Sequence, residues 1–282
     1  MRSKVYGGLA IAGFTALVTT AWVGDAAAVT SISACPQTLS KPGEMYVLTA
    51  DLHASGDCLT VAADRVTIDL KGHSITGNGT GGGIREGEGG WNMVSVRNGS
   101  IVSFEYGIDL ASSTRSEVRN VKVEGNGVDG MLLGNRALVK NCSASRNGWY
   151  GIEAADYVLV QETVVKANGG GGILVGDHAS LIRNSVDDHV GEGGAYVNGI
   201  TAGDFATITG NYVGESSGYG LRAGASSQVN SNTVSNNRSV GIQVACPSTV
   251  ANNKAWANDP DYEMYPEGKC RGNNNSTSPG TK

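Results

Sequence analysis

The sequence is poor in the residues on which many folds and metal sites depend. Aromatic residues make up 6% of its 282 residues, and it has only six prolines and four histidines. It contains no Cys-X-X-Cys motif and no Cys/His spacing of a zinc finger, which excludes the common small metal-binding modules. Its net charge is −5. A mildly acidic chain lacks the basic surface that phosphate backbones require, which excludes nucleic acid as the main partner.

Long apolar runs are absent except at the N-terminus, where the pattern is typical of an export signal. Arg2 and Lys4 precede a mostly apolar stretch, 5–23, and three alanines at 26–28 form a small-residue cleavage site. A membrane anchor is the alternative, but the stretch is interrupted by glycine and threonine and is short for a span. Cleavage after Ala28 is therefore predicted. The mature chain would have no membrane span and would be secreted or periplasmic.

The five cysteines all follow this segment, and four of them stand near the two ends of the region described next. Export makes disulfides plausible, and we expect Cys35 to pair with Cys58 and Cys246 with Cys270. Each bond would close a loop of about 24 residues and contribute roughly 2–4 kcal/mol. Cys142 falls on an inward position, which predicts a buried free thiol.

Glycine and asparagine are abundant and recur about every 21 residues. Apolar anchors fall at Leu70, Val96, Val118, Val139, Val160, Ile182, Ile208, Val229 and Val250, at intervals of 26, 22, 21, 21, 22, 26, 21 and 21 residues. Two residues after each anchor stands Gly72, Asn98, Asn120, Asn141, Glu162, Asn184, Gly210, Ser231 or Asn252. Glycine and asparagine tolerate positive φ, so this column predicts a tight left-handed corner.

A second glycine column precedes a short strand in each repeat. It consists of Gly107, Gly130, Gly151, Gly172, Gly199, Gly220 and Gly241, each followed by alternating apolar residues. Three short strands and three corners in about 21 residues predict one coil of a parallel β-helix. Asn211, Asn232 and Asn253 occupy inward positions in successive coils, where their amides are expected to form a hydrogen-bonded ladder.

Two longer repeats interrupt this regularity. Their extra residues, 79–91 and 187–198, are both predicted to enlarge the corner that leads into the glycine column. Insertions confined to one corner mark the functional face of a repeat protein.

The asparagine and glycine corners and the opening stretch VTIDLKGHSITG, 66–77, resemble the right-handed parallel β-helix superfamily. This superfamily includes pectate-lyase-like enzymes, mannuronan epimerase-like proteins and short-repeat periplasmic proteins. The resemblance implies an all-β, single-stranded right-handed parallel β-helix of about nine coils of 21–26 residues, capped at both ends. The predicted organisation is a signal peptide (1–28), an N-terminal cap (29–62), the β-helix (63–258), and a C-terminal cap with a disordered tail (259–282).

The resemblance also implies that a polysaccharide lies along the strands that follow the glycine column. Outward positions there are Asp109, Leu132, Glu153, Leu174, Thr201, Arg222 and Gln243. The expected substrate-binding aromatics beside them are Tyr106, Trp149, Tyr150 and Tyr219. The alternative is that these rings shield the glycine corners of neighbouring coils.

Uronate β-elimination requires a base and a cationic group, and the candidates near this edge are Arg222, His189, Tyr196 and Glu153. A glycoside hydrolase would instead need two carboxylates, for which Glu153 and Asp177 form the candidate pair.

Asp156, Asp177 and Asp204 recur one coil apart and predict a possible Ca²⁺ site, since hard cations take several oxygen ligands. The alternative is that they form Asx-turns at the start of each loop. A basic column (Lys71, Arg97, Arg119, Lys140 and Arg183) follows the anchors. It would suit an anionic polymer, but the favoured interpretation is that it opposes stacking of sheets or pairs with outward acidic residues.

The sequence therefore favours an exported β-helix protein that binds an extracellular polysaccharide, with uronate-type lyase or epimerase activity as the expected chemistry. The alternative is a non-catalytic surface or periplasmic β-helix that serves as an adhesin, scaffold or maturation factor. Whether the protein is an enzyme is left open at this level.

Overall fold

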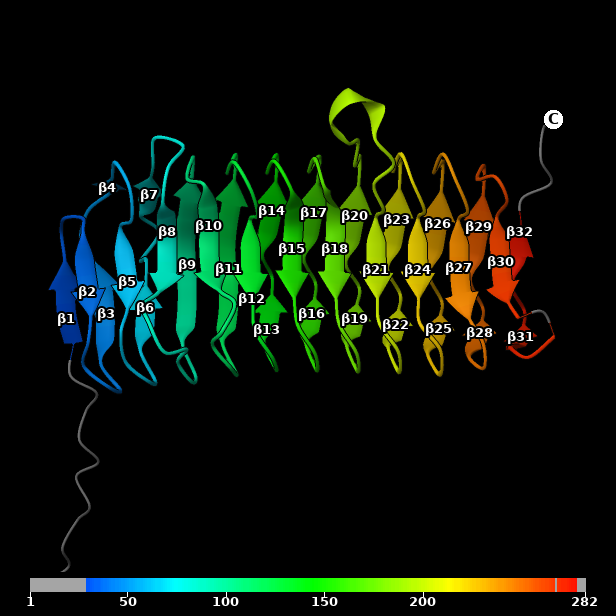
Figure 1. Cartoon of the computed structure of the whole chain (residues 1–282), viewed down its shortest axis with the longest axis horizontal. Coiled ribbons are helices and arrows are strands. Elements are labelled where there is room, and N and C mark those ends of the chain that lie inside the picture. Colours follow the sequence, from blue (N-terminus) through cyan, green and yellow to red (C-terminus); the bar gives the residue numbers. More distant parts are fainter. Residues whose placement is uncertain (1–28, 267, 278–282) are drawn as a thin grey trace, which may run out of the picture.

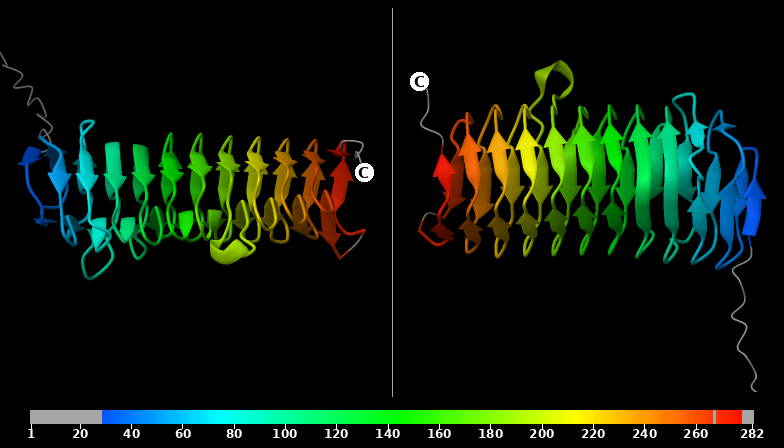
Figure 2. Two further views of the ribbon diagram at one scale, coloured as in Figure 1. Left: turned by 90° about the horizontal axis from the view of Figure 1, so that it is seen from above. Right: turned by 180° about the vertical axis from the view of Figure 1, so that it is seen from behind.

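The chain winds into stacked coils whose strands all pair in parallel (Figure 1). The computed structural model describes residues 29–266 and 268–277, so the predicted signal segment, 1–28, lies outside the described residues. The views in Figure 2 show that successive coils have nearly the same outline. The predicted fold class is confirmed, with eleven turns where about nine were expected. Within the described part of the chain, no helix is long and apolar enough to cross a membrane.

One strand from each coil forms an eleven-stranded sheet, which faces the viewer in Figure 1 and is called the eleven-stranded face below. Its strands are β2 (Gln37–Leu39), β5 (Leu59–Val61), β8 (Gly82–Glu86), β10 (Tyr106–Leu110), β12 (Met131–Leu133), β15 (Tyr150–Ala154), β18 (Gly171–Val175), β21 (Ile200–Ala202), β24 (Leu221–Ala223), β27 (Ile242–Ala245) and β30 (Tyr262–Tyr265).

The other strands form a 21-stranded sheet that bends to make two more faces, because β9 (Ser95–Val102) and β11 (Glu117–Glu124) run through both. The anchor face holds the remaining anchor strands: β1 (Val29–Ile32), β3 (Met45–Leu48), β6 (Thr67–Asp69), β13 (Leu138–Lys140), β16 (Leu159–Gln161), β19 (Ser180–Ile182), β22 (Thr207–Thr209), β25 (Gln228–Asn230), β28 (Thr249–Ala251) and β31 (Arg271–Asn273). The third face holds β4 (Leu52–His53), β7 (Ser74–Thr76), β14 (Ser143–Ser145), β17 (Val164–Lys166), β20 (Ser185–Asp187), β23 (Tyr212–Gly214), β26 (Thr233–Ser235), β29 (Lys254–Trp256) and β32 (Ser276–Thr277).

The core is a set of columns in which each apolar side chain rests on its equivalent one coil away. Val118, Val139 and Val160 are in register on the anchor face and are fully buried. The corner after these anchors is left-handed as predicted, for example at Asn141, where φ is 52°. Spacing across the core is tight, since a Cβ added to Gly130 would lie 2.6 Å from the amide nitrogen of Asn147. Glycine is therefore required at this column by close packing.

Two ladders of buried polar side chains run through the interior. The predicted ladder is confirmed, because the side-chain amide of Asn211 donates to Asn232 (3.0 Å) and that of Asn232 donates to Asn253 (3.0 Å). It also extends to Asn184 and Asn275. A second ladder lies at the next inward corner in two parts, one from Asn126 through Asn147 and Asn168 to His189, and one from Ser216 through Asn237 to Asn258. These bonds satisfy polar groups that would otherwise be unpaired in the interior. His189 Nε2, where the two parts meet, has no partner within the described residues.

Two anchors were misplaced in the sequence pattern. Val160 pairs with Leu181, and Ile182 is partly exposed beside it, so the corner of this coil is Arg183. In the first regular coil, Val96 pairs with Ile68, and Leu70 belongs to the following corner. Both errors arose because two neighbouring apolar residues fit the repeat equally well.

The two longer coils differ from each other. Ile68 and Ile75 are seven residues apart, whereas their partners in the next coil, Val96 and Ile101, are five residues apart. Two extra residues of the first longer coil therefore lie in the corner between the anchor face and the third face, and the rest are spread over the other two corners. The prediction that the first insertion enlarges a single corner is wrong. The second insertion does lie in the corner leading into the eleven-stranded face, where it carries the 3₁₀ turn η1 (Glu192–Gly194) and projects from the body in Figure 1.

The coils also reach beyond the predicted range of 63–258. β1 pairs with β3 and β2 with β5 in the region predicted to be a cap, and β31 and β32 continue the 21-stranded sheet to Thr277. Residues 272–277 of the predicted disordered tail are thus strand residues, while 278–282 lie outside the described residues.

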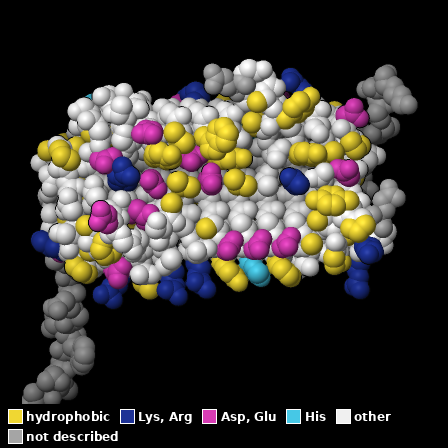
Figure 3. Space-filling model, in the orientation of Figure 1, with side chains coloured by type: hydrophobic (Ala, Val, Ile, Leu, Met, Phe, Trp, Pro, Cys, Tyr) yellow, Lys and Arg dark blue, Asp and Glu magenta, His cyan; other side chains and the backbone are white. Residues whose placement is uncertain are grey.

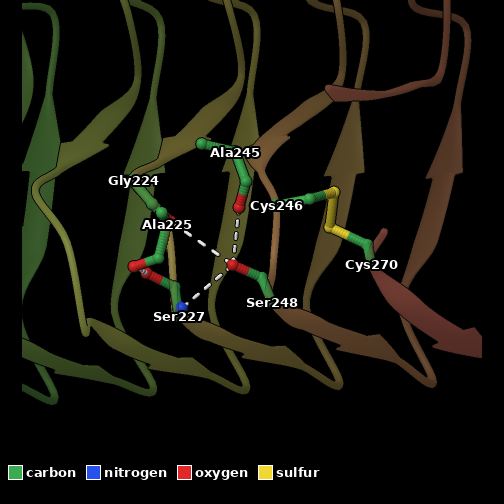
Figure 4. The surroundings of a disulfide bond; sticks show 7 residues. All are labelled: Gly224, Ala225, Ser227, Ala245, Cys246, Ser248 and Cys270. Carbon is green, nitrogen blue, oxygen red and sulfur yellow. Dashed lines mark hydrogen bonds between the residues drawn. A yellow bond between two sulfur atoms is a disulfide. The ribbon is translucent and has the colours of Figure 1, made fainter. Parts of the chain in front are cut away.

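Both predicted disulfides are present, Cys35–Cys58 and Cys246–Cys270, and Cys142 is a buried free thiol. Beside the second disulfide, the amide of Ser227 donates to the hydroxyl of Ser248, which donates to Ala245 O (Figure 4).

Candidate functional site on the eleven-stranded face

The outward side chains of the eleven-stranded face form one continuous row. The register aligns Thr60, Arg85, Asp109, Leu132, Glu153, Leu174, Thr201, Arg222, Gln243 and Glu263. Figure 3 views this face and shows acidic and hydrophobic side chains gathered over its N-terminal half. Neighbouring positions are about 4.8 Å apart, as in any β-sheet. The row therefore offers polar groups at a regular spacing along the axis of the helix.

Aromatic rings lie along the edge of the row that precedes the glycine column. Trp149 and Tyr150 meet edge to face with their centroids 5.7 Å apart, and Trp149 is 52% exposed. Space for them comes from the next coil, since a Cβ added to Gly170 or Gly171 would lie 2.6 Å from Trp149 or 2.8 Å from Tyr150. The two glycines therefore hold both rings beside the row.

The other predicted binding aromatics border the same row farther along. Tyr106 begins β10 and is half-buried, and Tyr219 lies before β24, where the guanidinium of Arg222 is 6.0 Å from its ring. The four rings thus share one edge of the face, although Tyr219 stands three coils from Tyr150.

Asp129 is the residue of this region that the sequence pattern did not reveal. It lies between Tyr106 and Tyr150 in the position before the glycine column, it is 3% exposed, and it accepts a hydrogen bond from the amide of Tyr150 (2.8 Å). The equivalent residue Asn198 accepts the same bond from Tyr219 (3.0 Å). Since an uncharged amide serves this bond, the fold does not require a carboxyl group at position 129.

The electrostatic environment of Asp129 favours its protonated form. Burial raises its pKa to about 6, the Tyr150 amide opposes the rise, and the charges of Glu153 and Asp109 add to it. Burial likewise raises the pKa of Glu153 and that of Asp109. The pKa of Tyr150 is raised by burial and then by the charges of Glu153 and Asp129. Asp109, Asp129 and Glu153, here called the carboxylate cluster, therefore hold a proton more readily than exposed acids do.

A polar cleft of about 640 Å³ adjoins the cluster at its N-terminal side. It is lined by Asp57, Thr60, Arg85, the segment 86–90, Asp109 and Ser112. Arg85 pairs with Asp57 there (3.2 Å), and Glu86 accepts hydrogen bonds from Ser112 N and Ser113 Oγ. Its donors and acceptors suit the hydroxyl groups of a sugar.

The four predicted catalytic residues do not come together. Glu153 lies in the row, but Arg222 is three coils away, about 14 Å at the spacing of parallel strands. Tyr196 is 73% exposed on the second insertion. The expectation that His189 stands at the open edge is wrong, because it is fully buried in the second ladder, where its Nδ1 accepts the amide of Asn168 (3.1 Å). Burial lowers the pKa of His189 to about 4.

The predicted metal column makes backbone hydrogen bonds. Asp156 accepts the amide of Asp177, Asp177 that of Asp204, and Asp204 that of Ala225, at 2.7–2.8 Å. Each of these bonds joins a side chain to the backbone of the next coil, 21 or 27 residues later, so the column links successive coils and does not form the Asx-turns given as the alternative. No group of three or more His, Cys, Asp or Glu residues within 29–266 and 268–277 is placed to hold a metal ion. Asp177 also lies past the end of β18, in this corner column, so it does not face Glu153.

Comparison with known proteins places the chain among proteins of the same architecture. The family model described as "Right handed beta helix region" matches residues 57–202. The chain belongs to this right-handed β-helix family. No curated protein matches its sequence.

Solved structures show how far the likeness of this right-handed β-helix extends. The mannuronan C-5 epimerase AlgE6 A-module of Azotobacter vinelandii has a TM-score of 0.69 and 10% identity over 91% of this chain and 92% of that one. The periplasmic alginate epimerase AlgG has a TM-score of 0.56 and 10% identity over 83% and 73%. The Dettilon tailspike protein has a TM-score of 0.56 and 12% identity, covering 84% of this chain and 61% of that one. At these identities the likeness shows the fold alone.

Proposed function

We propose that this right-handed β-helix is exported, binds an extracellular polysaccharide lengthwise along the eleven-stranded face, and cleaves it with the carboxylate cluster. The observation that carries the proposal is the juxtaposition of Trp149 and Tyr150 with Asp129 and Glu153 in adjacent coils. Rings present apolar faces to the C–H groups of sugars, and paired carboxyls of unequal pKa provide an acid and a base. The named activities of the alginate epimerases are consistent with a polysaccharide partner.

The roles of the two carboxyls follow from their surroundings. Asp129, whose pKa of about 6 keeps much of it protonated at weakly acidic pH, is suited to donate a proton to the glycosidic oxygen. Glu153 lies on an outward position and is suited to act as the base that activates water. Export, a prerequisite for meeting such a substrate, is supported by the two disulfides.

The charge of the site favours a neutral glycan over a polyuronate. β-Elimination needs a cationic group to neutralise the substrate carboxylate, but Arg85 is already paired with Asp57, and Arg222 lies three coils from Glu153. Three carboxyl groups would repel a uronate unless they were protonated. Hydrolysis of a neutral chain is therefore proposed ahead of the lyase or epimerase reaction expected from the sequence.

The experiment combines a binding assay with two product assays on the same panel of neutral glycans, alginate and pectate. Hydrolysis yields new reducing ends, whereas elimination yields an unsaturated product that absorbs ultraviolet light. We expect Glu153→Gln to lower turnover by about 100-fold or more while leaving binding unchanged. Trp149→Ala should weaken binding, and Tyr265→Ala, an exposed aromatic at the far end of the face, should not. Binding without turnover would favour the adhesin or scaffold alternative. The absence of both binding and turnover would refute the proposal.

A further inference from the structure

The corner between the eleven-stranded face and the anchor face carries two exposed columns, one residue apart in each coil, along the lower edge of Figure 1. The first column contains Asn135, Asp156, Asp177 and Asp204. The second contains Arg65, Met93, Arg115, Arg136, Tyr157, His178 and Phe205, each with φ between 56° and 60°. The backbone amides of Arg115, Arg136, Tyr157 and His178 donate to the carbonyls of Asn135, Asp156, Asp177 and Asp204 in the next coil, so both columns are in register. Together they are called the corner strip.

Large side chains occupy the middle of the strip although its backbone is left-handed. Tyr157, His178 and Phe205 stack with centroids 4.5 and 4.8 Å apart, and the guanidinium of Arg136 lies 5.3 Å from the Tyr157 ring. The conformation suits glycine or asparagine, and bulky residues adopt it rarely. Tyr157 is nevertheless 52% exposed and Phe205 53%. The strip therefore holds bulky rings in an unfavourable backbone conformation, although about half of the surface of Tyr157 and Phe205 remains exposed to solvent in the monomer.

Charged side chains on the strip lack oppositely charged partners within the described chain, although its aspartates accept backbone amides and Arg136 lies over the Tyr157 ring. On the anchor face, Arg97 pairs with Asp69, and Lys140 and Arg183 pair with Glu162. Across residues 29–266 and 268–277, no ion pair involves Arg65, Arg115 or Arg136, nor Asp156, Asp177 or Asp204. The strip thus holds cations and anions that remain available to another molecule.

The charges of the strip would match those of a second copy that runs in the opposite direction. Arginines stand in the N-terminal half of the strip and aspartates in the C-terminal half, with Tyr157 between them. Figure 3 shows basic groups projecting from the lower edge on the N-terminal side and a row of acidic groups farther along. Two copies have the same spacing between coils, so a register that matches one pair of charges also matches the next.

We propose that a second copy of this chain packs antiparallel along the corner strip, related by a two-fold axis close to Tyr157. Arg136 then faces Asp177 of the second copy, and Arg115 faces Asp204 of the second copy. Each pair occurs twice because a two-fold interface uses the same patch on both molecules. The exposed rings of Tyr157, His178 and Phe205 lie at its centre and lose contact with water. This pairing leaves the eleven-stranded face open.

Sedimentation equilibrium of the mature chain at low and high salt tests the proposal. We expect a concentration-dependent dimer that weakens with salt, because charges at such an exposed strip are screened. The double variants Arg115→Glu/Arg136→Glu and Asp177→Arg/Asp204→Arg should each lose the dimer. Arg238→Glu, a reversal of an exposed charge outside the strip, should retain it.

Mixing the two double variants provides the decisive arm. One carries only acidic groups and the other only basic groups in these positions, so an equimolar mixture should form a heterodimer. Recovery on mixing also shows that both variants are folded. The proposal is overturned if the wild-type chain is monomeric at every concentration, if either double variant dimerises as the wild type does, or if mixing restores nothing. The proposal is likewise overturned if the wild-type chain associates with an unrelated basic protein but not with a second copy of itself.

Discussion

Replacing Asp129 with asparagine should stabilise the protein at neutral pH while removing its proposed activity. Asparagine keeps the acceptor for the Tyr150 amide, as Asn198 does for Tyr219. The variant lacks only the charge that the buried site disfavours. A residue selected for the fold alone would not show this opposition between stability and activity.

The magnitude follows from the pKa of Asp129, which burial raises from 3.8 to about 6. A group whose pKa is higher in the folded state stabilises the fold at low pH, and that contribution is lost as the pH rises through the folded-state value. About two pKa units correspond to at most about 3 kcal/mol. Asp129→Asn should therefore match the wild type near pH 4 and exceed its free energy of unfolding by about 2–3 kcal/mol at pH 8.

Urea unfolding followed by circular dichroism between pH 4 and 8 measures this difference. The control is Asp57→Asn, which occupies the equivalent position, accepts the amide of Gly82 and is exposed beside Arg85. It should show no gain in stability at any pH. If Asp129→Asn changes stability equally at pH 4 and pH 8, Asp129 does not have the raised pKa on which this prediction depends. If the variant retains full turnover of the substrate, Asp129 is not the proton donor.

Three other substitutions test the interior and the end of the helix. Asn232→Ala should lower the free energy of unfolding by roughly 2–4 kcal/mol in urea, because it removes the acceptor of the buried Asn211 amides and the donor to Ile208 O and Asn253; a loss below about 0.5 kcal/mol would contradict the ladder's role. His189→Asn should reduce the loss of stability between pH 6.5 and 4, since burial lowers the pKa of His189 to about 4 and the neutral ring stabilises the fold only above this window; identical pH profiles would count against it. The double variant Cys246→Ala/Cys270→Ala should have a free energy of unfolding about 3 kcal/mol below that of the wild type, as expected for a loop of 24 residues. A reducing agent should abolish the part of this difference that comes from the Cys246–Cys270 bond.

The fold could be predicted from the sequence because its periodicity is local. Asn141 and Gly151 each mark a fixed place in a 21-residue unit, and the same unit recurs until the coils stack. Exact registers were harder to predict, since the adjacent apolar residues Leu181 and Ile182 both fit the anchor position and only strand pairing distinguishes them. The ends were misjudged because the first and last coils have short strands with weak periodicity.

The site was harder to predict because its properties depend on neighbours in other coils. Asp129 precedes Gly130 as Tyr150 precedes Gly151, and nothing in its own segment shows that it is buried. Its environment comes from Tyr150 and Glu153, more than 20 residues later. His189 was misassigned for the related reason that the second insertion hides its place in the asparagine ladder. A signal was available, since His189 follows Asn168 by one period of 21 residues.

The pairing of Trp149 and Tyr150 with Gly170 and Gly171 has a consequence for how this protein can vary. The rings belong to one coil, but the room they occupy is set by residues 21 positions later. A substitution that adds a side chain at Gly171 would displace the Tyr150 ring without touching its own segment. Aromatic residues on this edge can therefore be gained or lost only in step with the following repeat, which makes two successive coils the smallest unit that evolution or design can exchange.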